Sequence, residues 1–210
     1  MTSPKAKLAG LALIAALCAG FTLGLPAPAW AGMDEGKAAY RQGDYATAIR
    51  EWRPLAEQGN VEAQYQLGFM YENSQGVPQD YTKAVGWYRK AAEQGNGEVQ
   101  SKAQVNLGLM YENGLGVPQD YAEAVKWFRK AAEQGYADAQ SNLGMLYRYG
   151  SGVPQDYVLA HLWLNLAASR FSRGANRDLA FKNRDIVAKR MTPAQIFEAQ
   201  KLAREWKPKK

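Results

Sequence analysis

Apolar residues recur along the chain at helical spacing, in pairs of segments separated by a short polar stretch. In residues 61–72, Ala63, Leu67 and Tyr71 follow one another at intervals of four, which places them on one face of an α-helix. Residues 81–92 have a second apolar face, made of small and aromatic residues: Ala84, Trp87, Tyr88, Ala91 and Ala92. The pattern therefore predicts two helices in this unit, called here helix A and helix B.

The unit occurs three times in succession along the chain. Residues 67–95 and 107–135 are identical at 22 of 29 positions, and residues 143–169 form a third copy. The period is 36 residues, but 40 residues separate the first copy from the second. Self-similarity at such a period predicts a stacked helical repeat. The four extra residues, within 95–104, predict either a longer loop or one more helical turn.

The hexapeptide Gly-Val-Pro-Gln-Asp-Tyr separates the two helices at 76–81, 116–121 and 152–157. We expect Gly76 to take the positive φ that ends helix A, Pro78 to prevent its continuation, and Asp80 to cap helix B. In the second copy Glu123 follows Asp120 by three residues, a spacing typical of a capping box. The hexapeptides contain no Lys or Arg and lack phosphate-loop spacing, so the pattern favours a structural turn.

A glycine recurs inside every helix A, as Gly68, Gly108 and Gly144. Glycine in a helix interior costs roughly 1 kcal/mol relative to alanine. Its recurrence predicts that a neighbouring helix passes too close for a side chain.

A tryptophan recurs in helix B of each copy. One period upstream, Gly43, Asp44 and Tyr45 followed by Ala48 and Trp52 keep the spacing of the motif and indicate a partial copy. We assign four of the six tryptophans to one core position of helix B: Trp52, Trp87, Trp127 and Trp163.

The combined motif resembles the Sel-one-like repeat, a relative of the tetratricopeptide repeat. It reads Ala-x-x-x-Leu-Gly-x-x-Tyr, then Gly-Val-Pro-x-Asp-Tyr, then Ala-x-x-Trp-Tyr/Phe-x-Lys-Ala-Ala, and covers about residues 36–170. The resemblance implies an all-α, right-handed α-solenoid of antiparallel helix pairs that serves as a protein-binding scaffold. The closing stretch 183–206 also resembles the end of bacterial exported members. Residues 165–166 and 169–171 depart from the motif, so we expect irregular stacking beyond them.

Some secreted members of that family carry a disulfide in each repeat and have been linked to β-lactam binding. The one cysteine here, Cys18, lies in the first 31 residues, so this activity is not carried over.

The first 31 residues have a basic start, an apolar run from Leu8 to Leu25, and the ending Ala29-Trp30-Ala31. They resemble a secretory signal peptide cleaved after Ala31, and the alternative is an uncleaved membrane anchor. We expect a periplasmic or secreted protein with a partial repeat at 32–60, three repeats at 61–170 and a basic helical cap at 171–210.

Charge is distributed unevenly along the rest of the chain. Residues 32–169 have 12 Lys and Arg against 16 Asp and Glu, whereas residues 170–210 have 12 against 4. Export and acidic repeats argue against nucleic acid as a ligand. The basic end suggests a patch for an anionic envelope component, with a solvated capping helix as the alternative: Arg173, Arg177, Lys182, Arg184, Lys189 and Arg190.

Within this cap, Thr192-Pro193-Ala194-Gln195 predicts a capping box with Pro at the first helical position. We expect a last helix from about Pro193 to Trp206. Its inward residues are Ile196, Ala199, Leu202, Ala203 and Trp206.

The sequence contains little that predicts catalysis. The only histidine, His161, lies in an apolar helix B without a nucleophile pattern, and no metal-ligand spacing occurs. We therefore predict neither a cofactor nor an enzymatic activity, and favour a scaffold for a protein or peptide partner over an envelope hydrolase or ligand-binding enzyme.

The predicted partner surface lies on helix A, opposite its core stripe. Residues two before and two after Leu67 are turned by about 160° from it. The set mixes apolar anchors with carboxylates and amides, as a peptide groove should, although Phe69 and Leu109 also fit packing between successive helices A. Its members in the three copies are Tyr65, Phe69, Glu72 and Asn73, then Val105, Leu109, Glu112 and Asn113, then Ser141, Met145, Arg148 and Tyr149.

Overall fold

A computed structural model describes residues 31–95 and 97–209, which fold into ten α-helices and contain no strand. The helices are α1 (Ala31–Arg41), α2 (Tyr45–Glu57), α3 (Val61–Glu72), α4 (Tyr81–Ala92), α5 (Glu98–Asn113), α6 (Tyr121–Glu133), α7 (Ala137–Tyr149), α8 (Tyr157–Arg170), α9 (Ala175–Ala188) and α10 (Pro193–Glu205). The expected signal segment, residues 1–31, lies outside the described residues except for Ala31. None of the described helices is long and apolar enough to cross a membrane.

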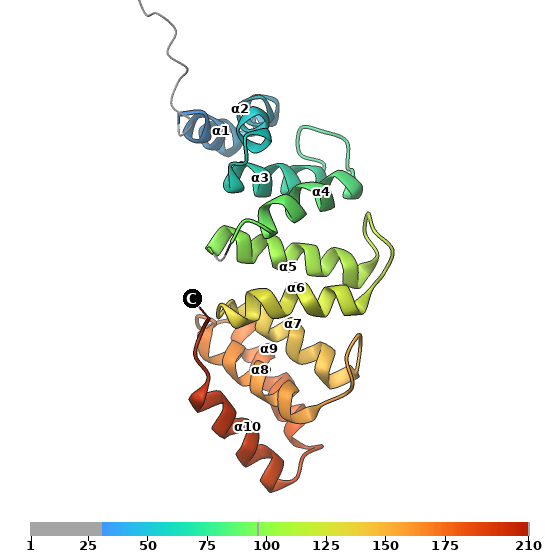
Figure 1. Cartoon of the computed structure of the whole chain (residues 1–210). Coiled ribbons are helices and arrows are strands. Elements are labelled where there is room, and N and C mark those ends of the chain that lie inside the picture. The colour runs from blue at the N-terminus through green and yellow to red at the C-terminus, as the bar shows by residue number, and fades with distance from the viewer. Residues whose placement is uncertain (1–30, 96, 210) are drawn as a thin grey trace, which may run out of the picture.

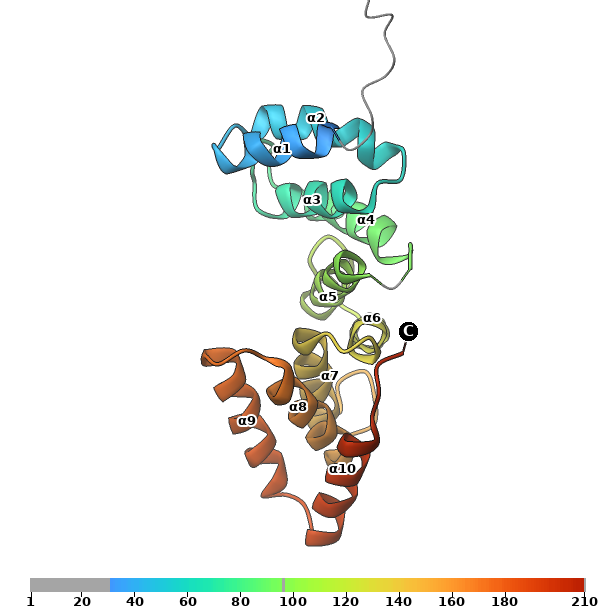
Figure 2. The same cartoon turned by 90° about the vertical axis from the view of Figure 1, so that its left-hand side faces the viewer.

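Each of the helices α1 to α9 packs mainly on its neighbours in the chain, so the molecule is a stack that starts with α1 and ends with α9 and α10 (Figures 1 and 2). This arrangement confirms the predicted helical solenoid. Helices α3, α5 and α7 are the helices A of the three copies, and α4, α6 and α8 are their helices B. α10 returns to pack on α8.

The four extra residues lengthen a helix. α5 has 16 residues, compared with 12 in α3 and 13 in α7. The added turn lies at the N-terminal end of α5 and begins at Glu98.

The repeated aspartates cap helix B as predicted. Asp80 accepts a hydrogen bond from the backbone N–H of Lys83, and Asp156 accepts one from Leu159. Asp120 likewise accepts from Ala122 and Glu123. The capping box expected for Glu123 is wrong, because the Glu123 carboxylate pairs with the ammonium group of Lys126 at 3.0 Å.

The hexapeptide glycine of the first copy, Gly76, takes the predicted positive φ, +70°, but it does not end helix A, whose C-cap in that copy is Asn73. In the second and third copies helix A ends at Gly114 and Gly150, two residues earlier, both in the left-handed region. Gly116 has a φ of +70°, and a Cβ placed there would lie 2.3 Å from the carbonyl carbon of Tyr81 in the preceding copy. Gly152 has the same contact with Tyr121. These glycines therefore let each turn nest against the first residue of the preceding helix B.

The glycine inside helix A marks a close approach, as predicted. A Cβ on Gly108 would lie 2.6 Å from the ring of Phe128, and one on Gly68 would lie 2.7 Å from the ring of Tyr88. In the partial copy Trp52 occupies the same place over Gly36. The assignment of Trp52 to the position of Trp87 is thus wrong by one residue.

A buried glutamine in each helix A ties it to the preceding helix. The side-chain amides of Gln64, Gln104 and Gln140 donate to backbone carbonyls at the ends of α2, α4 and α6. Gln64 and Gln104 also accept hydrogen bonds, from Gln94 and Gln134. Gln140 is fully buried, yet its side-chain oxygen has no partner within the described residues. The third copy has Arg170 where the others have Gln94 and Gln134.

The C-terminal helices close the stack. Thr192 and Gln195 form the predicted capping box at the start of α10. Trp206 packs edge-on against Trp163, with ring centroids 6.2 Å apart, and the Arg170 guanidinium lies over its ring. Lys209 then reaches Glu133 of α6 at 2.8 Å.

Candidate binding cavity on the helix A face

A cavity of about 500 Å³ opens on the face formed by helices A. Its walls come from α3, α5 and α7, and from the segment between α8 and α9 together with the first turns of α9. In Figure 2 α9 projects to the left of α5 and α7, so its start closes one end of the cavity. The lining residues are Tyr65, Lys102, Val105, Asn106, Leu109, Tyr136, Asp138, Ser141, Asn142, Phe171, Asn176 and Leu179.

Four residues of the predicted partner surface line this cavity: Tyr65, Val105, Leu109 and Ser141. They occupy the central turns of the three helices A. The structure therefore brings part of the predicted surface to one concave site.

The other eight residues of the predicted partner surface lie outside the cavity lining. Phe69 and Met145 pack against the hydrophobic core, and the Glu72 carboxylate accepts a hydrogen bond from the Tyr88 hydroxyl. Asn73 and Asn113 donate to carbonyls of their own helices. The remaining three lie near the C-terminal ends of helices A and are partly or fully exposed: Glu112, Arg148 and Tyr149.

The C-terminal ends of α5 and α7 carry a carboxylate, a guanidinium group and an exposed aromatic ring. Burial raises the pKa of the Glu112 carboxyl above its ordinary value. Arg148 lies over the ring of Tyr149, and Tyr149 is 61% exposed. This region is a partly solvated rim beside the cavity.

Lys102 and Asp138 are the two charged residues of the cavity lining. The Lys102 ammonium group pairs with the Glu98 carboxylate at 2.7 Å, and this hydrogen bond raises the pKa of Lys102. Asp138 remains open to solvent, but the surrounding protein removes enough water to raise the pKa of its carboxyl. Burial also raises the pKa values of Tyr65 and Tyr136, so both hydroxyls stay protonated at neutral pH.

Sequence reasoning missed eight lining residues. Five of them come from α5 and from α7 with its N-cap residue: Lys102, Asn106, Tyr136, Asp138 and Asn142. The other three come from the chain after the third repeat: Phe171, Asn176 and Leu179. Leu179 is 54% exposed, so it presents apolar surface at the cavity.

The predicted basic patch is divided between different faces of α9. The guanidinium groups of Arg177 and Arg184 lie over the ring of Phe181, and Arg184 also donates to Asn165 and Asp185. Four members are exposed: Arg173, Lys182, Lys189 and Arg190. The side chains of Lys182 and Lys189 leave α9 more than 90° from those of Arg177 and Arg184. The six cations therefore do not form one continuous surface.

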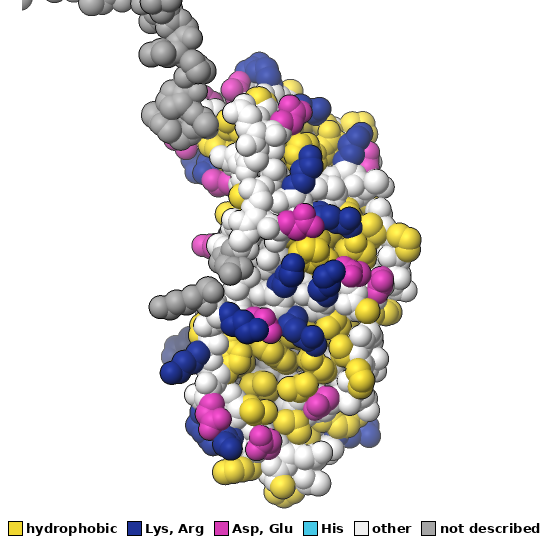
Figure 3. Space-filling view, viewed as in Figure 1, with side chains coloured by type: hydrophobic (Ala, Val, Ile, Leu, Met, Phe, Trp, Pro, Cys, Tyr) yellow, Lys and Arg dark blue, Asp and Glu magenta, His cyan; other side chains and the backbone are white. Residues whose placement is uncertain are grey.

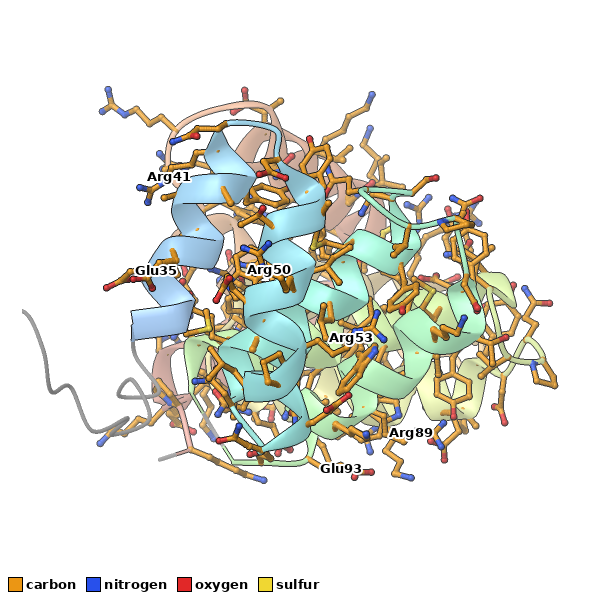
Figure 4. All side chains as sticks on the ribbon, turned by 90° about the horizontal axis from the view of Figure 1, so that it is seen from above. Glu35, Arg41, Arg50, Arg53, Arg89 and Glu93 are labelled. Carbon is orange, nitrogen blue, oxygen red and sulfur yellow. The ribbon has the colours of Figure 1, made fainter. Side chains whose placement is uncertain are left out.

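A second group of cations lies on the face formed by helices B. In Figure 3 Lys and Arg side chains form a band across the middle of the stack, separated by apolar side chains. Three arginines donate to the hydroxyl of a tyrosine on the following helix: Arg53 to Tyr71, Arg89 to Tyr111 and Arg129 to Tyr147. Figure 4 shows Arg53 and Arg89 on the same flank. These contacts link consecutive helices.

The remaining chemical candidates do not assemble into a reaction centre. His161 of α8 is buried, and desolvation together with the nearby Arg184 lowers its pKa. Within residues 31–95 and 97–209 no group of three or more His, Cys, Asp or Glu is placed to hold a metal ion.

Comparison with known proteins agrees with this architecture. The Sel1 repeat model matches residues 61–96, 101–136 and 137–170. A Sel1 repeat protein from Oxalobacter formigenes is 32% identical, with a TM-score of 0.61, over 84% of this chain and 74% of that one.

The protective antigen c5321 of uropathogenic Escherichia coli, which displays an SLR fold, is 31% identical with a TM-score of 0.50. The match covers 85% of this chain but 45% of c5321, so the chain spans less than half of that relative's length. No curated protein sequence matches the chain significantly. The three matched repeats and the fold show that the chain belongs to the Sel1 repeat family.

Proposed function

We propose that the chain is a non-catalytic scaffold that binds a polypeptide partner in the helix A cavity. Sel1 repeats typically mediate interactions between proteins. The observation that carries the proposal is the cavity itself, which has a volume in the range of ligand sites and combines apolar walls with amides and two charges. A polypeptide is the natural occupant, because its backbone offers donors and acceptors to the asparagines while its side chains fill the apolar part.

We further propose that it binds this partner in the bacterial periplasm or envelope. Support comes from the basic start, apolar run and Ala-x-Ala ending of residues 1–31. Protein isolated from a periplasmic fraction should begin at Gly32 on N-terminal sequencing. A start at Met1 would contradict cleavage.

Filling the cavity tests the binding proposal. Ser141 lies half-buried in the lining, so Ser141→Trp should occupy the space of the partner. Affinity capture from periplasmic extract should recover proteins with the wild type that are lost with this variant. Gln200→Trp is the matched control, because Gln200 is exposed on α10 and lies outside the cavity.

Both variants should keep the helical circular dichroism spectrum and melting temperature of the wild type. If Ser141→Trp folds normally and captures the same proteins as the wild type, the cavity is not the binding site.

A further inference from the structure

The three copies of the repeat allow an internal comparison of the positions around the cavity. Six equivalent residues of helix A read Val-Glu-Ala-Gln-Tyr-Gln at 61–66, Ser-Lys-Ala-Gln-Val-Asn at 101–106 and Ala-Asp-Ala-Gln-Ser-Asn at 137–142. The Ala and Gln shared by all copies are buried. The positions around them differ, and in the second and third copies most of them line the cavity. Stacking of the copies therefore does not determine which side chains line the cavity.

Two departures from the repeat meet at this site. The extra turn of α5 supplies Glu98, which pairs with Lys102. At the other end, Phe171 stands where the second copy has Gly135, and it forms a wall with Leu179. Irregularities far apart in the sequence thus contribute to one cavity.

The charges in the cavity are not balanced. Lys102 is neutralised by Glu98, whereas Asp138, at the same helix A position one copy later, forms no ion pair within residues 31–95 and 97–209. Glu62 holds this position in the first copy and is paired with Lys37 at 2.9 Å. Of the three charged residues at this helix A position, Asp138 is therefore the one whose carboxylate can pair with a cationic group of a ligand.

The surroundings of Asp138 indicate which other groups a ligand would meet in the cavity. Tyr136, two residues before it, lines the same cavity and presents an aromatic ring. Val105, Leu109, Phe171 and Leu179 provide apolar surface, and Leu179 is largely exposed. Asn106, Asn142 and Asn176 place a side-chain amide on each of three helices, where each offers both a donor and an acceptor.

We infer that the partner presents an extended segment with a lysine or arginine side chain at Asp138 and a large apolar side chain beside it. This inference rests on the proposed function. The cation pairs with the Asp138 carboxylate, the apolar residue covers Leu109, Phe171 and Leu179, and the asparagine amides bind the backbone of the segment. A carboxylate beside aromatic rings favours a cationic side chain through both charge and cation–π attraction.

Random peptides displayed on phage test this chemistry without knowledge of the natural partner. Selection on the purified wild-type chain should enrich peptides with a basic residue next to a large apolar one.

One enriched peptide is then synthesised, and its dissociation constant is measured by fluorescence anisotropy. Asp138→Asn should weaken binding by about tenfold to a hundredfold, the usual effect of losing a charge-assisted hydrogen bond. Exchanging the basic residue of the peptide for glutamine should weaken it similarly, and the two changes together should add little.

Glu62→Gln is the matched control, because Glu62 has the same position in helix A but lies outside the cavity. It should leave binding unchanged. Enriched peptides without a basic residue, or equal affinity for wild type and Asp138→Asn, would overturn the inference and leave the cavity as a peptide site. Failure to enrich any peptide, or binding that Ser141→Trp does not reduce, would overturn the proposed function as well.

Discussion

Gln104 and Gln140 are the same residue of two consecutive copies, and both are buried. Each donates to a carbonyl at the end of the preceding helix, at 3.1 Å. They differ in the acceptor half of the amide, since Gln134 donates to Gln104 whereas the side-chain oxygen of Gln140 has no partner within the described residues. A buried acceptor without a partner carries an uncompensated desolvation cost.

Replacing these two glutamines by leucine should therefore have unequal effects. Gln104→Leu removes two hydrogen bonds, whereas Gln140→Leu removes one and also relieves an unpaired oxygen. We expect Gln104→Leu to lower the free energy of unfolding by about 1 kcal/mol more than Gln140→Leu. Urea titration followed by circular dichroism measures the difference. Equal losses would mean that the oxygen of Gln140 is satisfied in solution, for instance by a water molecule.

The turn between helices A and B is the element that sets the spacing of the copies. Gly116 and Gly152 lie directly against the backbone that opens the preceding helix B. The Thr82 hydroxyl also donates to the carbonyl of Gly116. A side chain at these glycines would push two copies apart, because it would meet backbone atoms that cannot rotate away.

Gly116→Ala should destabilise the array by about 1 to 3 kcal/mol, through the backbone overlap and the strain of alanine at a φ of +70°. Gly86→Ala is the matched control. Gly86 lies exposed inside α4, and no other element comes within 4 Å of the place that an added methyl group would take, so alanine there should stabilise by about 0.5 to 1 kcal/mol. Thermal unfolding of both variants measures the contrast, and shifts of the same sign would contradict the nesting contact.

Much of the fold was predictable at this scale because each element carries its own signals. The aspartate caps and the capping box at Thr192 depend on residues close in sequence. The four extra residues before α5 were compatible with either a longer loop or one more helical turn, and the structure shows the turn. The position of Trp52 was not obtained, because matching tryptophans by type hid its equivalence to Tyr88. The nesting of Gly116 against Tyr81 was also missed, since it joins residues 35 positions apart.

The cavity was predicted only in part, for a similar reason. Helical periodicity predicts which face of helix A lies opposite the core, and that face contains four of the lining residues: Tyr65, Val105, Leu109 and Ser141. The wall at Phe171 and Leu179 depends on how the chain leaves α8 and enters α9, where the repeat pattern has ended. No periodicity extends to that turn, so neither Phe171 nor Leu179 was predicted to line a binding site.

In the whole molecule, α10 and the tail close the end of the stack at which the repeat pattern fails. Trp206 contacts Trp163 and Arg170 of α8, and Lys209 reaches back to α6. Stability in such arrays comes from each unit and its immediate neighbours. The influence of this cap should therefore diminish with distance along the stack.

Trp206→Ala should accelerate hydrogen exchange of backbone amides in α8 and α10, with a smaller effect in α7 and none in α1 to α3. The reason is that the lost contacts all lie at the C-terminal end, so local opening there becomes easier. Exchange monitored by mass spectrometry resolves these segments. Uniform acceleration along the chain would show instead that the array unfolds as one cooperative unit.

The nested turns also bear on how such a chain can grow. Because every copy meets the next through the same glycine, a duplicated second copy would fit between the second and third without a new kind of joint. The duplicate would bring its own equivalents of Glu98 and Lys102 beside the third copy, so these charges would still share a site with Phe171 and Leu179. The first copy, in contrast, would move away by one full period, and Val105 of the original second copy would take the place of Tyr65 in the lining. A gene duplication harmless to folding would thus keep the charges of the cavity and exchange one of its aromatic walls for an aliphatic one.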